Sequence, residues 1–177
     1  MEIVSTMGSG SLGRELDLDV FVDALREAVE YDINPGYSDS GMITVRLEPE
    51  GVAYLFYRSG SFQIRGAENE AALEKAEARL QEVFAEIGLE VPEYSFEQRT
   101  AVFMENLDRS IDLERLMIEL GLEHTEYEPE QFPALIYKPP AFEVTLLIFS
   151  SGKIIIGGTM SKRTAQEAID HLTESLG

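Results

Sequence analysis

The chain contains no cysteine, only two histidines (His124 and His171) and no long apolar run. Without thiols it can form neither disulfides nor thiolate metal sites, and two histidines cannot build a histidine-rich zinc site. No apolar run reaches the roughly 18 residues that would span a bilayer. No basic segment followed by an apolar one opens the chain, as a signal peptide would. We therefore expect a soluble, cytoplasmic protein without a metal or other cofactor.

Positive charge is also scarce. Fourteen basic residues face 33 acidic ones, which gives a net charge of −19, and only four of the basic residues are lysines. An even acidic coat with little lysine suits a cytoplasm rich in salt, where charge repulsion is strongly screened; the alternative is an ordinary acidic protein. Taken alone, the charge argues against a nucleic-acid ligand, because phosphate binding normally needs a basic surface.

An internal repeat is the main positive feature of the sequence. Residues 53–67 and 145–159 both consist of an apolar strand-like segment, a Ser-Gly turn and a second apolar segment, with turn glycines Gly60 and Gly152. Two further pairs of blocks recur in the same order: 15–25 with 110–120, and 32–37 with 127–132. Chance is a poor explanation for several matching blocks in one order. We predict an N-terminal repeat over 1–92 and a C-terminal repeat over 93–177.

Each repeat is predicted to contain the same elements. A first strand, at about 2–6 or 99–104, leads into a short helix, further strands and a longer amphipathic helix. Apolar residues spaced by three and four mark the helices: Leu18, Phe21, Val22 and Leu25, and Leu73, Ala76, Leu80, Phe84 and Ile87, then Leu113, Leu116, Met117 and Leu120, and Ala165, Ile169, Leu172 and Leu176. The glycine-rich segment 8–13 lacks the lysine of a phosphate-binding loop and is predicted to be a flexible loop.

These elements predict an α+β fold in which two tandem pseudo-symmetric repeats form one curved antiparallel sheet, a saddle with the helices on its convex face. Several strands, such as 144–149 and 153–156, are apolar on both faces. If helices cover one face only, the other face exposes an apolar surface, which normally means a partner. The alternative is that other parts of the chain cover both faces.

Three segments resemble the TATA-binding proteins of archaea, and the chain is similar to a divergent haloarchaeal member. EYEPEQFPALIYK at 126–138 resembles the second-repeat signature of that family. LLIFSSGKIII at 146–156, followed by Gly158, resembles its next hairpin, and STMGSGSLGRELDL at 5–18 resembles the opening of the haloarchaeal members. The resemblance covers essentially the whole chain and is stronger in the C-terminal repeat.

The resemblance implies a general transcription factor rather than an enzyme. Such a protein binds A·T-rich double-stranded promoter DNA in the minor groove through its concave sheet, drives apolar wedges between base steps and bends the duplex. It also recruits transcription factor B. An exposed apolar sheet additionally makes a homodimer possible. The alternative function is a paralog with weakened or lost DNA binding that regulates transcription initiation through protein contacts.

In the C-terminal repeat the family's wedge and rim positions are filled as the resemblance requires. Phe132 and Phe149 occupy the positions of the paired wedge phenylalanines. Lys138 and Lys153 occupy the positions of cations at the rim of the sheet, which contact phosphates. Three of the four lysines, Lys138, Lys153 and Lys162, lie in this repeat. The fourth, Lys75, lies in the N-terminal repeat. This placement partly answers the objection raised by the acidic net charge.

The N-terminal repeat departs from the family at the same positions. Tyr57 stands at one wedge position, and Tyr37 is the only aromatic near the other. Arg46 matches a rim cation, whereas Ser61 replaces the lysine that follows the Ser-Gly turn. One wedge with a polar tip and one missing cation predict a weaker contribution from this repeat.

The centre of the expected groove contact departs as well. The family carries an asparagine on each opening strand, and its position is Thr100 in the C-terminal repeat and Met1 or Glu2 in the N-terminal one. A threonine that follows the third strand is replaced by Arg65 and Gly157. These changes predict a site preference different from that of the typical family member.

The acidic turn before Phe132 matches a partner-binding site of the family. Glu128 and Glu130, in YEPEQF, occupy the second-repeat stirrup that contacts transcription factor B. The alternative for these two glutamates is a solvated turn. No nucleophile motif, phosphate-binding loop or histidine beside a nucleophile and an acid is present, so the sequence gives catalysis little support.

Overall fold

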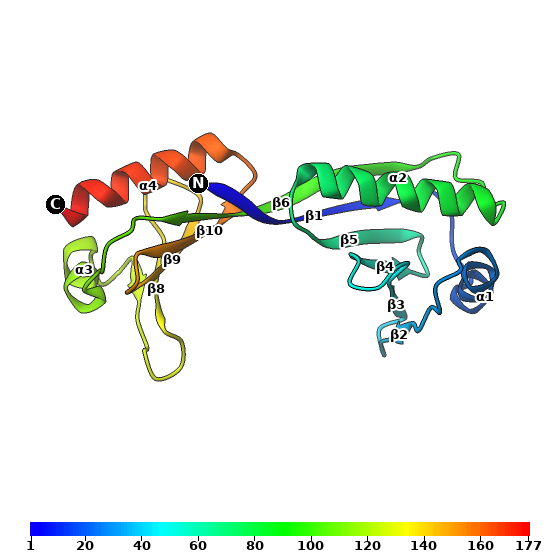
Figure 1. Ribbon diagram of the computed structural model, residues 1–177, viewed down its shortest axis with the longest axis horizontal. Coiled ribbons are helices and arrows are strands. Elements are labelled where there is room, and N and C mark those ends of the chain that lie inside the picture. Colours follow the sequence, from blue (N-terminus) through cyan, green and yellow to red (C-terminus); the bar gives the residue numbers. More distant parts are fainter. The chain divides into compact units, whose positions relative to one another are not determined.

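The structure, a computed structural model, describes residues 1–177 and contains ten strands and four helices (Figure 1). They follow one another as β1 (Glu2–Ser11), α1 (Leu18–Ala28), β2 (Gly36–Tyr37), β3 (Met42–Val45), β4 (Ala53–Tyr57), β5 (Ser61–Ala67), α2 (Glu70–Glu86), β6 (Ser95–Asn106), α3 (Leu113–Leu120), β7 (Thr125–Glu126), β8 (Ala134–Tyr137), β9 (Thr145–Phe149), β10 (Lys153–Thr159) and α4 (Lys162–Leu176). None of the helices is both long and apolar enough to cross a membrane.

The chain divides into two compact units. The N-terminal unit comprises Thr6–Arg99, and the C-terminal unit comprises Met1–Ser5 together with Thr100–Gly177. Each unit contains a long strand, a helix, a two-residue strand, three further strands and a second helix. The predicted repeat boundary at residue 92 falls between α2 and β6, and the long strands β1 and β6 contribute residues to both units.

All strand pairs that join these elements are antiparallel. The hydrogen-bonded order is β2-β3-β4-β5-β1-β6-β10-β9-β8-β7, so the second half repeats the order of the first in reverse. This confirms the predicted α+β fold of two tandem repeats that share one antiparallel sheet. The two-residue strands β2 and β7, which the sequence does not mark, add one short edge strand to each half.

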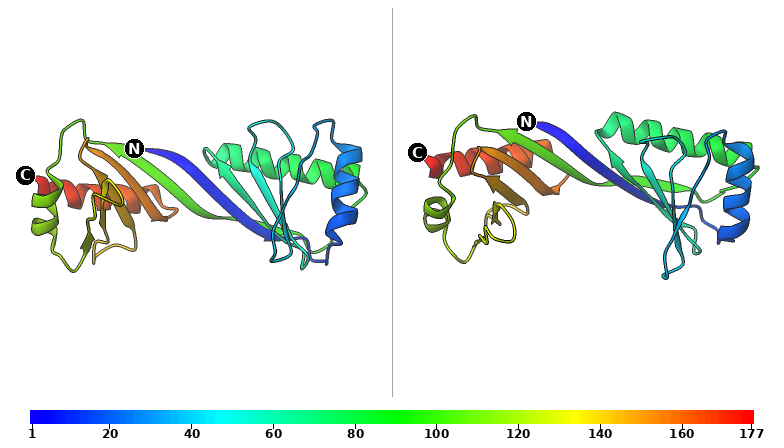
Figure 2. Two further views of the ribbon diagram at one scale, coloured as in Figure 1. Left: turned by 90° about the horizontal axis from the view of Figure 1, so that it is seen from below. Right: turned by 60° about the horizontal axis from the view of Figure 1, so that its bottom comes forward.

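The helices of the N-terminal unit cover one face of its strands (Figures 1 and 2). Helix α1 begins at Asp17, whose side chain accepts a hydrogen bond from the backbone N–H of Val20 and so satisfies a donor that the first turn leaves unpaired. Asn69 caps α2 in the same way, through the N–H of Ala72. The apolar stripes predicted for both helices are buried, apart from the half-buried Ile87, which follows the end of α2.

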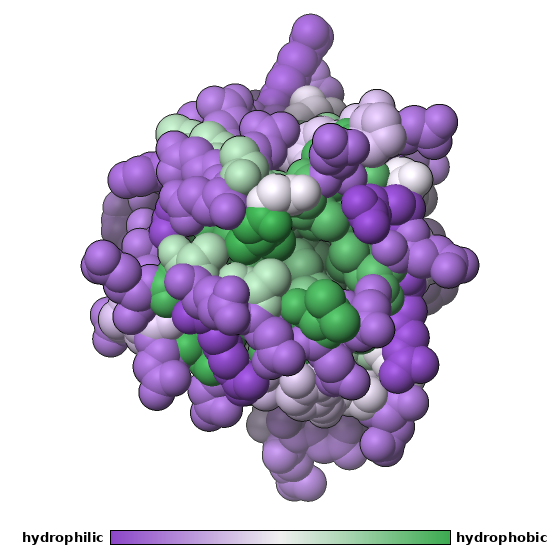
Figure 3. Space-filling model, turned by 90° about the vertical axis from the view of Figure 1, so that its right-hand side faces the viewer, coloured by the Kyte–Doolittle hydropathy of each residue, from purple (hydrophilic) through white to green (hydrophobic).

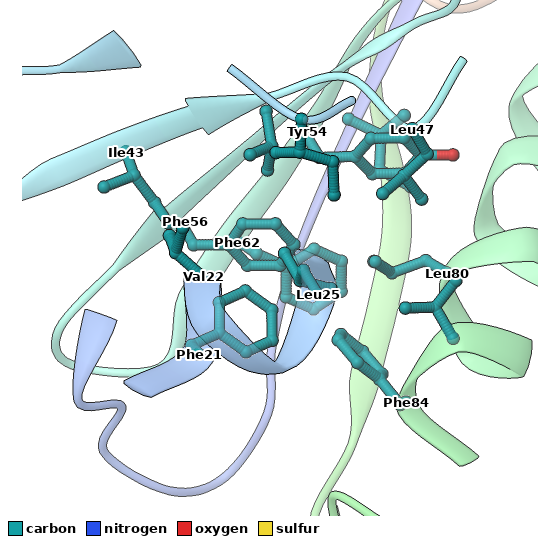
Figure 4. Packing of buried hydrophobic residues seen from close by; sticks show 14 of the residues in the cluster. Phe21, Val22, Leu25, Ile43, Leu47, Tyr54, Phe56, Phe62, Leu80 and Phe84 are labelled. Atoms are coloured by element: carbon teal, nitrogen blue, oxygen red, sulfur yellow. The ribbon is translucent and has the colours of Figure 1, made fainter. Parts of the chain in front are cut away.

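Phenylalanines dominate the core between these helices and the strands (Figure 4). The ring of Phe56 on β4 lies edge-on to that of Phe21 on α1, with 4.8 Å between ring centroids. It also lies edge-on to Phe84 on α2 at 6.4 Å and stacks on Phe62 at 6.3 Å. Such aromatic pairs stabilise the core beyond their buried area. The core is therefore held by rings that come from two helices and two strands.

The core of the C-terminal unit is mainly aliphatic. Asp112 and Ser161 cap α3 and α4 by accepting from backbone N–H groups three residues ahead. The helices bury apolar residues against alternate positions of β8, β9 and β10, which are Leu135, Tyr137, Leu146, Ile148, Ile154 and Ile156. Because side chains alternate along a strand, the intervening residues lie on the face without helices.

One prediction for the N-terminal segment is wrong. Residues 8–11 belong to β1, not to a flexible loop, and β1 is longer than the predicted strand at 2–6. A Cβ atom on Gly8 would lie 2.3 Å from Phe96, and one on Gly10 would lie 1.9 Å from the carbonyl oxygen of Ser95. The glycines therefore permit close packing of β6 residues against this strand.

Figure 3 views the molecule from the side of α1 and α2. Hydrophilic residues form most of the surface in that view, as the excess of carboxylates requires, and hydrophobic residues gather near its centre. Carboxylates of α2 such as Glu74, Glu82 and Glu86 are exposed. The exposed side of α2 is therefore rich in carboxylates.

Candidate nucleic-acid interface

The strand register defines the uncovered face of the C-terminal unit. Ile136 lies opposite Leu147, Leu147 opposite Ile155, and Ile155 opposite Met104. Opposed residues of antiparallel strands point to the same side, so these four side chains share a face. All of them are half-buried, whereas their neighbours along each strand are buried under the helices, apart from Glu105 beside Met104. We call this surface the C-terminal open face, and it is apolar.

Two phenylalanines meet at one edge of this face. Phe149 ends β9 opposite Ala134, and Phe132 precedes β8 by two residues. Their ring centroids are 6.2 Å apart with an interplanar angle of 67°, an edge-to-face arrangement. Phe132 is 40% exposed and Phe149 is half-buried. The structure thus brings together the two residues predicted to form a wedge pair and leaves both rings accessible.

The two predicted rim lysines lie at opposite ends of the same face. Lys138 follows the C-terminal end of β8, where its backbone N–H donates to the carbonyl of His124. Lys153 begins β10, which runs parallel to β8 because both are antiparallel to β9. Both lysines are exposed. Each is two residues from an open-face residue of its strand (Ile136 or Ile155), so both side chains lie on the open face. Their ammonium groups can therefore flank a ligand that lies across the strands.

The acidic turn is joined directly to the phenylalanine pair. The backbone N–H groups of Gln131 and Phe132 both donate to the carbonyl of Glu128, each at 2.9 Å. The side chains of Glu128 and Glu130 are exposed. These bonds fix the turn relative to Phe132 and leave its carboxylates available to a partner.

The N-terminal open face is defined in the same way. Met42 lies opposite Tyr57, Thr44 opposite Leu55, and Leu55 opposite Gln63. Tyr57, which the sequence predicts to be a wedge, is half-buried on this face. Ala134 pairs with Phe149 as Met42 pairs with Tyr57. The counterpart of Phe132, two residues before Ala134, is therefore Ser40, which has no ring.

The structure does not bring Tyr37 to this face, contrary to the prediction from the sequence. Tyr37 lies opposite Ile43, a buried residue that faces the helices, so its side chain is on the other side of the sheet. It is 61% exposed and lines an open hollow with Asp17 of the α1 cap and Arg58. The face that a side chain of a two-residue edge strand occupies depends on the pairing of that strand. A sequence pattern does not reveal this pairing.

Arg46, which the sequence predicts to be a rim cation, directly follows the end of β3. It follows the open-face residue Thr44 by two residues, so its side chain lies on the same face. Its guanidinium donates a hydrogen bond to the carbonyl of Gly51. Ser61 is exposed at the start of β5, opposite Ser11. The side chain at this strand start therefore carries no charge, unlike Lys153 in the C-terminal unit.

The register also corrects one expected equivalence on the opening strands. Ala67 lies opposite Thr6, and its counterpart Thr159 lies opposite Ala101. Thr6 therefore corresponds to Ala101, and the counterpart of the exposed Thr100 is Ser5, not Met1 or Glu2. The offset of 95 residues equals that between the caps Asp17 and Asp112, so the three extra residues of the first repeat lie after the cap of α1, which is itself three residues longer than α3.

Sequence reasoning missed a polar cluster on the N-terminal open face. Gln63 lies opposite Ser9, and Arg65 lies opposite Met7. The Nε–H of Arg65 donates to Oε1 of Gln63 at 2.8 Å, and the Nε–H of Arg99 donates to Oγ of Ser9 at 2.9 Å. The alternation of polar residues in SFQIR was the available signal, whereas the position of Arg99 depends on tertiary pairing.

Shifted pKa values occur away from both open faces. Burial, with a smaller effect of Glu48, raises the pKa of Tyr54 to about 12, and burial raises the pKa of Tyr137. A hydrogen bond from the N-terminal ammonium lowers the pKa of Glu105. Tyr54 and Tyr137 lie under the helices, and Glu105 lies opposite the buried Ile154. No group of three or more potential metal-ligating side chains occurs in the chain.

Comparisons with known proteins define the class first. Residues 1–87 and 95–177 each match the family model described as transcription factor TFIID (or TATA-binding protein, TBP). The solved structure of Methanococcus jannaschii TBP superimposes with a TM-score of 0.80 at 29% identity, covering 98% of this chain and 96% of that one. A two-repeat fold of this class, matched once by each repeat, accounts for the observed order of strands and helices.

Curated relatives agree with this class. TATA-box-binding protein C of Halobacterium salinarum is 35% identical over 97% of this chain and 94% of its own length. TATA-box-binding protein of Pyrobaculum islandicum is 37% identical over 98% of this chain and 83% of its own length. The chain belongs to the TATA-binding protein family. Members of this family are transcription factors, in agreement with the expectation of a protein that is not an enzyme.

Proposed function

We propose that this protein binds A·T-rich promoter DNA in the minor groove through its open faces and bends the duplex. The observation that carries the proposal is the accessible edge-to-face pair of Phe132 and Phe149 at the edge of an apolar sheet face. Relatives that cover nearly the whole chain are named for binding the TATA box. The sheet geometry and the names of the relatives support the same ligand.

The wedge pair is suited to unstacking a base step. Separating two stacked base pairs costs roughly a few kcal/mol per step, which flat apolar side chains offset by taking the place of the lost neighbour. Phe149 is held by the ladder of β9, and Phe132 by its backbone bond to Glu128 and by the following Pro133. Because the backbone at both residues is held before binding, little backbone entropy is lost when the rings insert.

The rest of the C-terminal open face suits the floor of the minor groove. At A·T pairs that floor presents only acceptors and sugar edges, so it offers little to charged side chains and much surface to apolar ones. Leu147, Ile155 and Met104 supply apolar contact area. Lys138 and Lys153, at opposite ends of the face, would contact the phosphates that border the groove.

A net charge of −19 changes how affinity is generated. Counterion release contributes little in concentrated salt, so binding depends more on apolar burial and wedging. The carboxylates of α2 lie on the covered side, away from the proposed contact. The protein is accordingly proposed to work in a salt-rich archaeal cytoplasm.

The acidic turn is proposed to recruit transcription factor B. Glu128 and Glu130 are exposed beside the wedge pair, and the turn is anchored to the same backbone as Phe132. A partner with basic residues could contact these carboxylates while the phenylalanines occupy DNA. Replacing both glutamates by glutamine should leave DNA binding unchanged and prevent transcription factor B from shifting the complex in a gel. Glu167→Gln on α4 is the matched control, and a normal shift with the double variant would contradict this contact.

Fluorescence anisotropy with an A·T-rich duplex in molar KCl tests the DNA contact directly. Phe149→Ala should weaken binding by about tenfold or more, since base–aromatic stacking contributes about 1–3 kcal/mol. The matched control is Phe142→Ala, because Phe142 packs beside His171 of α4, away from the open face. Thermal unfolding of both variants separates a binding defect from a loss of fold. Absence of binding by the wild-type protein, or equal affinity of Phe149→Ala, would contradict the proposed function.

A further inference from the structure

The N-terminal open face carries two arginines at its centre, where the C-terminal open face has none. Arg65 lies in the middle of β5, opposite Ala53 on one side and Met7 on the other. Arg99 on β6 reaches the same face, because its Nε–H donates to Ser9, which lies opposite Gln63. Both guanidinium groups thus lie on the sheet surface itself, not at its rim.

Hydrogen bonds hold this cluster in place. Arg65 uses its Nε–H to donate to Gln63, which leaves its four terminal N–H groups for a ligand. Glu97 pairs with a terminal nitrogen of Arg99, so Arg99 is partly neutralised, whereas Arg65 has no acidic partner within salt-bridge distance. Arg65 is exposed. It therefore presents a full positive charge in a planar arrangement of donors.

The counterparts in the C-terminal unit have different chemistry. Gly157 lies opposite Thr145 as Arg65 lies opposite Ala53, so Gly157 corresponds to Arg65. By the same register Ile155 corresponds to Gln63, and Met104, which lies opposite Ile155, corresponds to Ser9. The central positions are therefore arginine, glutamine and serine in one unit, and glycine, isoleucine and methionine in the other.

We propose that Arg65, with Arg99 beside it, inserts into a narrow A·T minor groove, and that the N-terminal unit holds its half of the DNA site without unstacking it. This inference rests on the proposed function and assigns a different DNA half-site to each unit. The ligand of the N-terminal unit is a run of adenines without a TpA step. The ligand of the C-terminal unit is a flexible TpA-containing segment.

Two physical arguments favour this assignment. A run of adenines is stiff and has a narrow minor groove with an enhanced negative potential, which attracts arginine; TpA steps unstack easily and suit a wedge. The N-terminal unit has the arginines, but only Tyr57 and Ser40 where the C-terminal unit has Phe149 and Phe132. In a chain of net charge −19, a positive centre on a sheet face also matches an anionic ligand.

The first test compares three duplexes of equal length and flanks by anisotropy in molar KCl. One contains two TpA-rich halves, one contains two adenine runs, and one contains one half of each kind. We expect the mixed duplex to bind most tightly. Arg65→Ala should remove its advantage over the duplex with two TpA-rich halves, a loss of about five- to tenfold. Arg65→Lys should recover only part of it, since lysine keeps the charge but not the planar donors.

Arg26→Ala is the matched control, because it removes the same charge from α1. This control should leave the ranking of the duplexes unchanged. Equal ranking by wild type and Arg65→Ala would overturn the inference. If wild type binds and Phe149→Ala weakens binding while Arg65→Ala does not change the ranking, the proposed function stands and this inference fails. If no duplex binds, both fail.

The second test locates the unstacked steps. 2-Aminopurine placed at each adenine in turn fluoresces more strongly where stacking is lost. We expect one bright step, within the TpA-containing half, which disappears in Phe149→Ala and persists in Arg65→Ala at saturating protein. Two bright steps, one in each half, would overturn the inference that the N-terminal unit leaves its half stacked.

Discussion

The two units differ in where they use phenylalanine. In the N-terminal unit Phe21, Phe56, Phe62 and Phe84 lie in the core, and the open face carries a polar cluster around Arg65. In the C-terminal unit the core is mainly aliphatic, and Phe132 and Phe149 lie at the edge of an apolar open face. One architecture can therefore use the same residue type for stability in one repeat and for ligand contact in the other. A side chain's role depends on its face of the sheet.

The largest expected effect comes from removing a ring from the aromatic core. Phe56 is 1% exposed and contacts rings from both helices, so Phe56→Ala should lower the free energy of unfolding by about 3–5 kcal/mol. Phe149→Ala should cost much less, because its ring is half-exposed. Urea unfolding in concentrated KCl measures both. Equal losses would break the contrast between a structural and a functional phenylalanine.

Transplanting the wedge pair sharpens the contrast. The double substitution Ser40→Phe and Tyr57→Phe gives the N-terminal unit the residues of the C-terminal one. We expect affinity for a duplex with two TpA-rich halves to rise by about tenfold, the value of one base–aromatic stack, and a second unstacked step to appear. Ser38→Phe, in the same loop but not at the counterpart of Phe132, is the control. An unchanged affinity would mean that the backbone around Ser40 does not direct a ring to the open face.

The helix caps test where the units are alike. Asp17 and Asp112 accept from Val20 and Arg115 at 3.2 and 3.1 Å, at corresponding positions of α1 and α3. Alanine at either position should lower the free energy of unfolding by about 1 kcal/mol, while asparagine should cost little because it also caps. Thermal unfolding checks this. A large difference between the two caps would contradict their equivalence.

The last expected effect is a pH dependence in the aromatic unit. Burial raises the pKa of Tyr54 from 10.0 to about 12, so the fold favours the neutral phenol, which donates to the carbonyl of Ala76 at 3.0 Å. This stabilisation is fully present below pH 10 and is lost as the pH rises toward 12. Tyr54→Phe should flatten the fall in unfolding midpoint over that interval. An equally steep fall in the variant would assign it to other groups.

Much of the candidate site was predictable because it lies in short local motifs. Phe132, Phe149, Lys138 and Lys153 all lie in the segments 126–138 and 146–156, whose sequences carry the resemblance to the family, and all are within two residues of a strand. The prediction for Tyr37 was wrong because the sheet face that its side chain occupies depends on pairing with Ile43 across a turn. A one-residue shift of register moves a side chain to the other face, and no local pattern fixed that register.

The other wrong prediction concerned the glycines of the N-terminal segment. Gly8 and Gly10 indicate a flexible loop when only the local sequence is considered, yet they lie in a strand against Phe96 and Ser95. The absence of a side chain serves flexibility in one context and close approach in another. Which of the two applies depends on β6, which is more than 80 residues away along the chain.

The sequence alone determined the tandem repeat, the amphipathic helices and the acidic composition, because periodicity and capping residues act over a few positions. Only the tertiary structure decided which side chains share a face: the pairing of Phe132 with Phe149, the displacement of Tyr37 and the cluster around Arg65. The physical reason is that strand partners distant in sequence set the register, and the register decides which of two faces each side chain occupies.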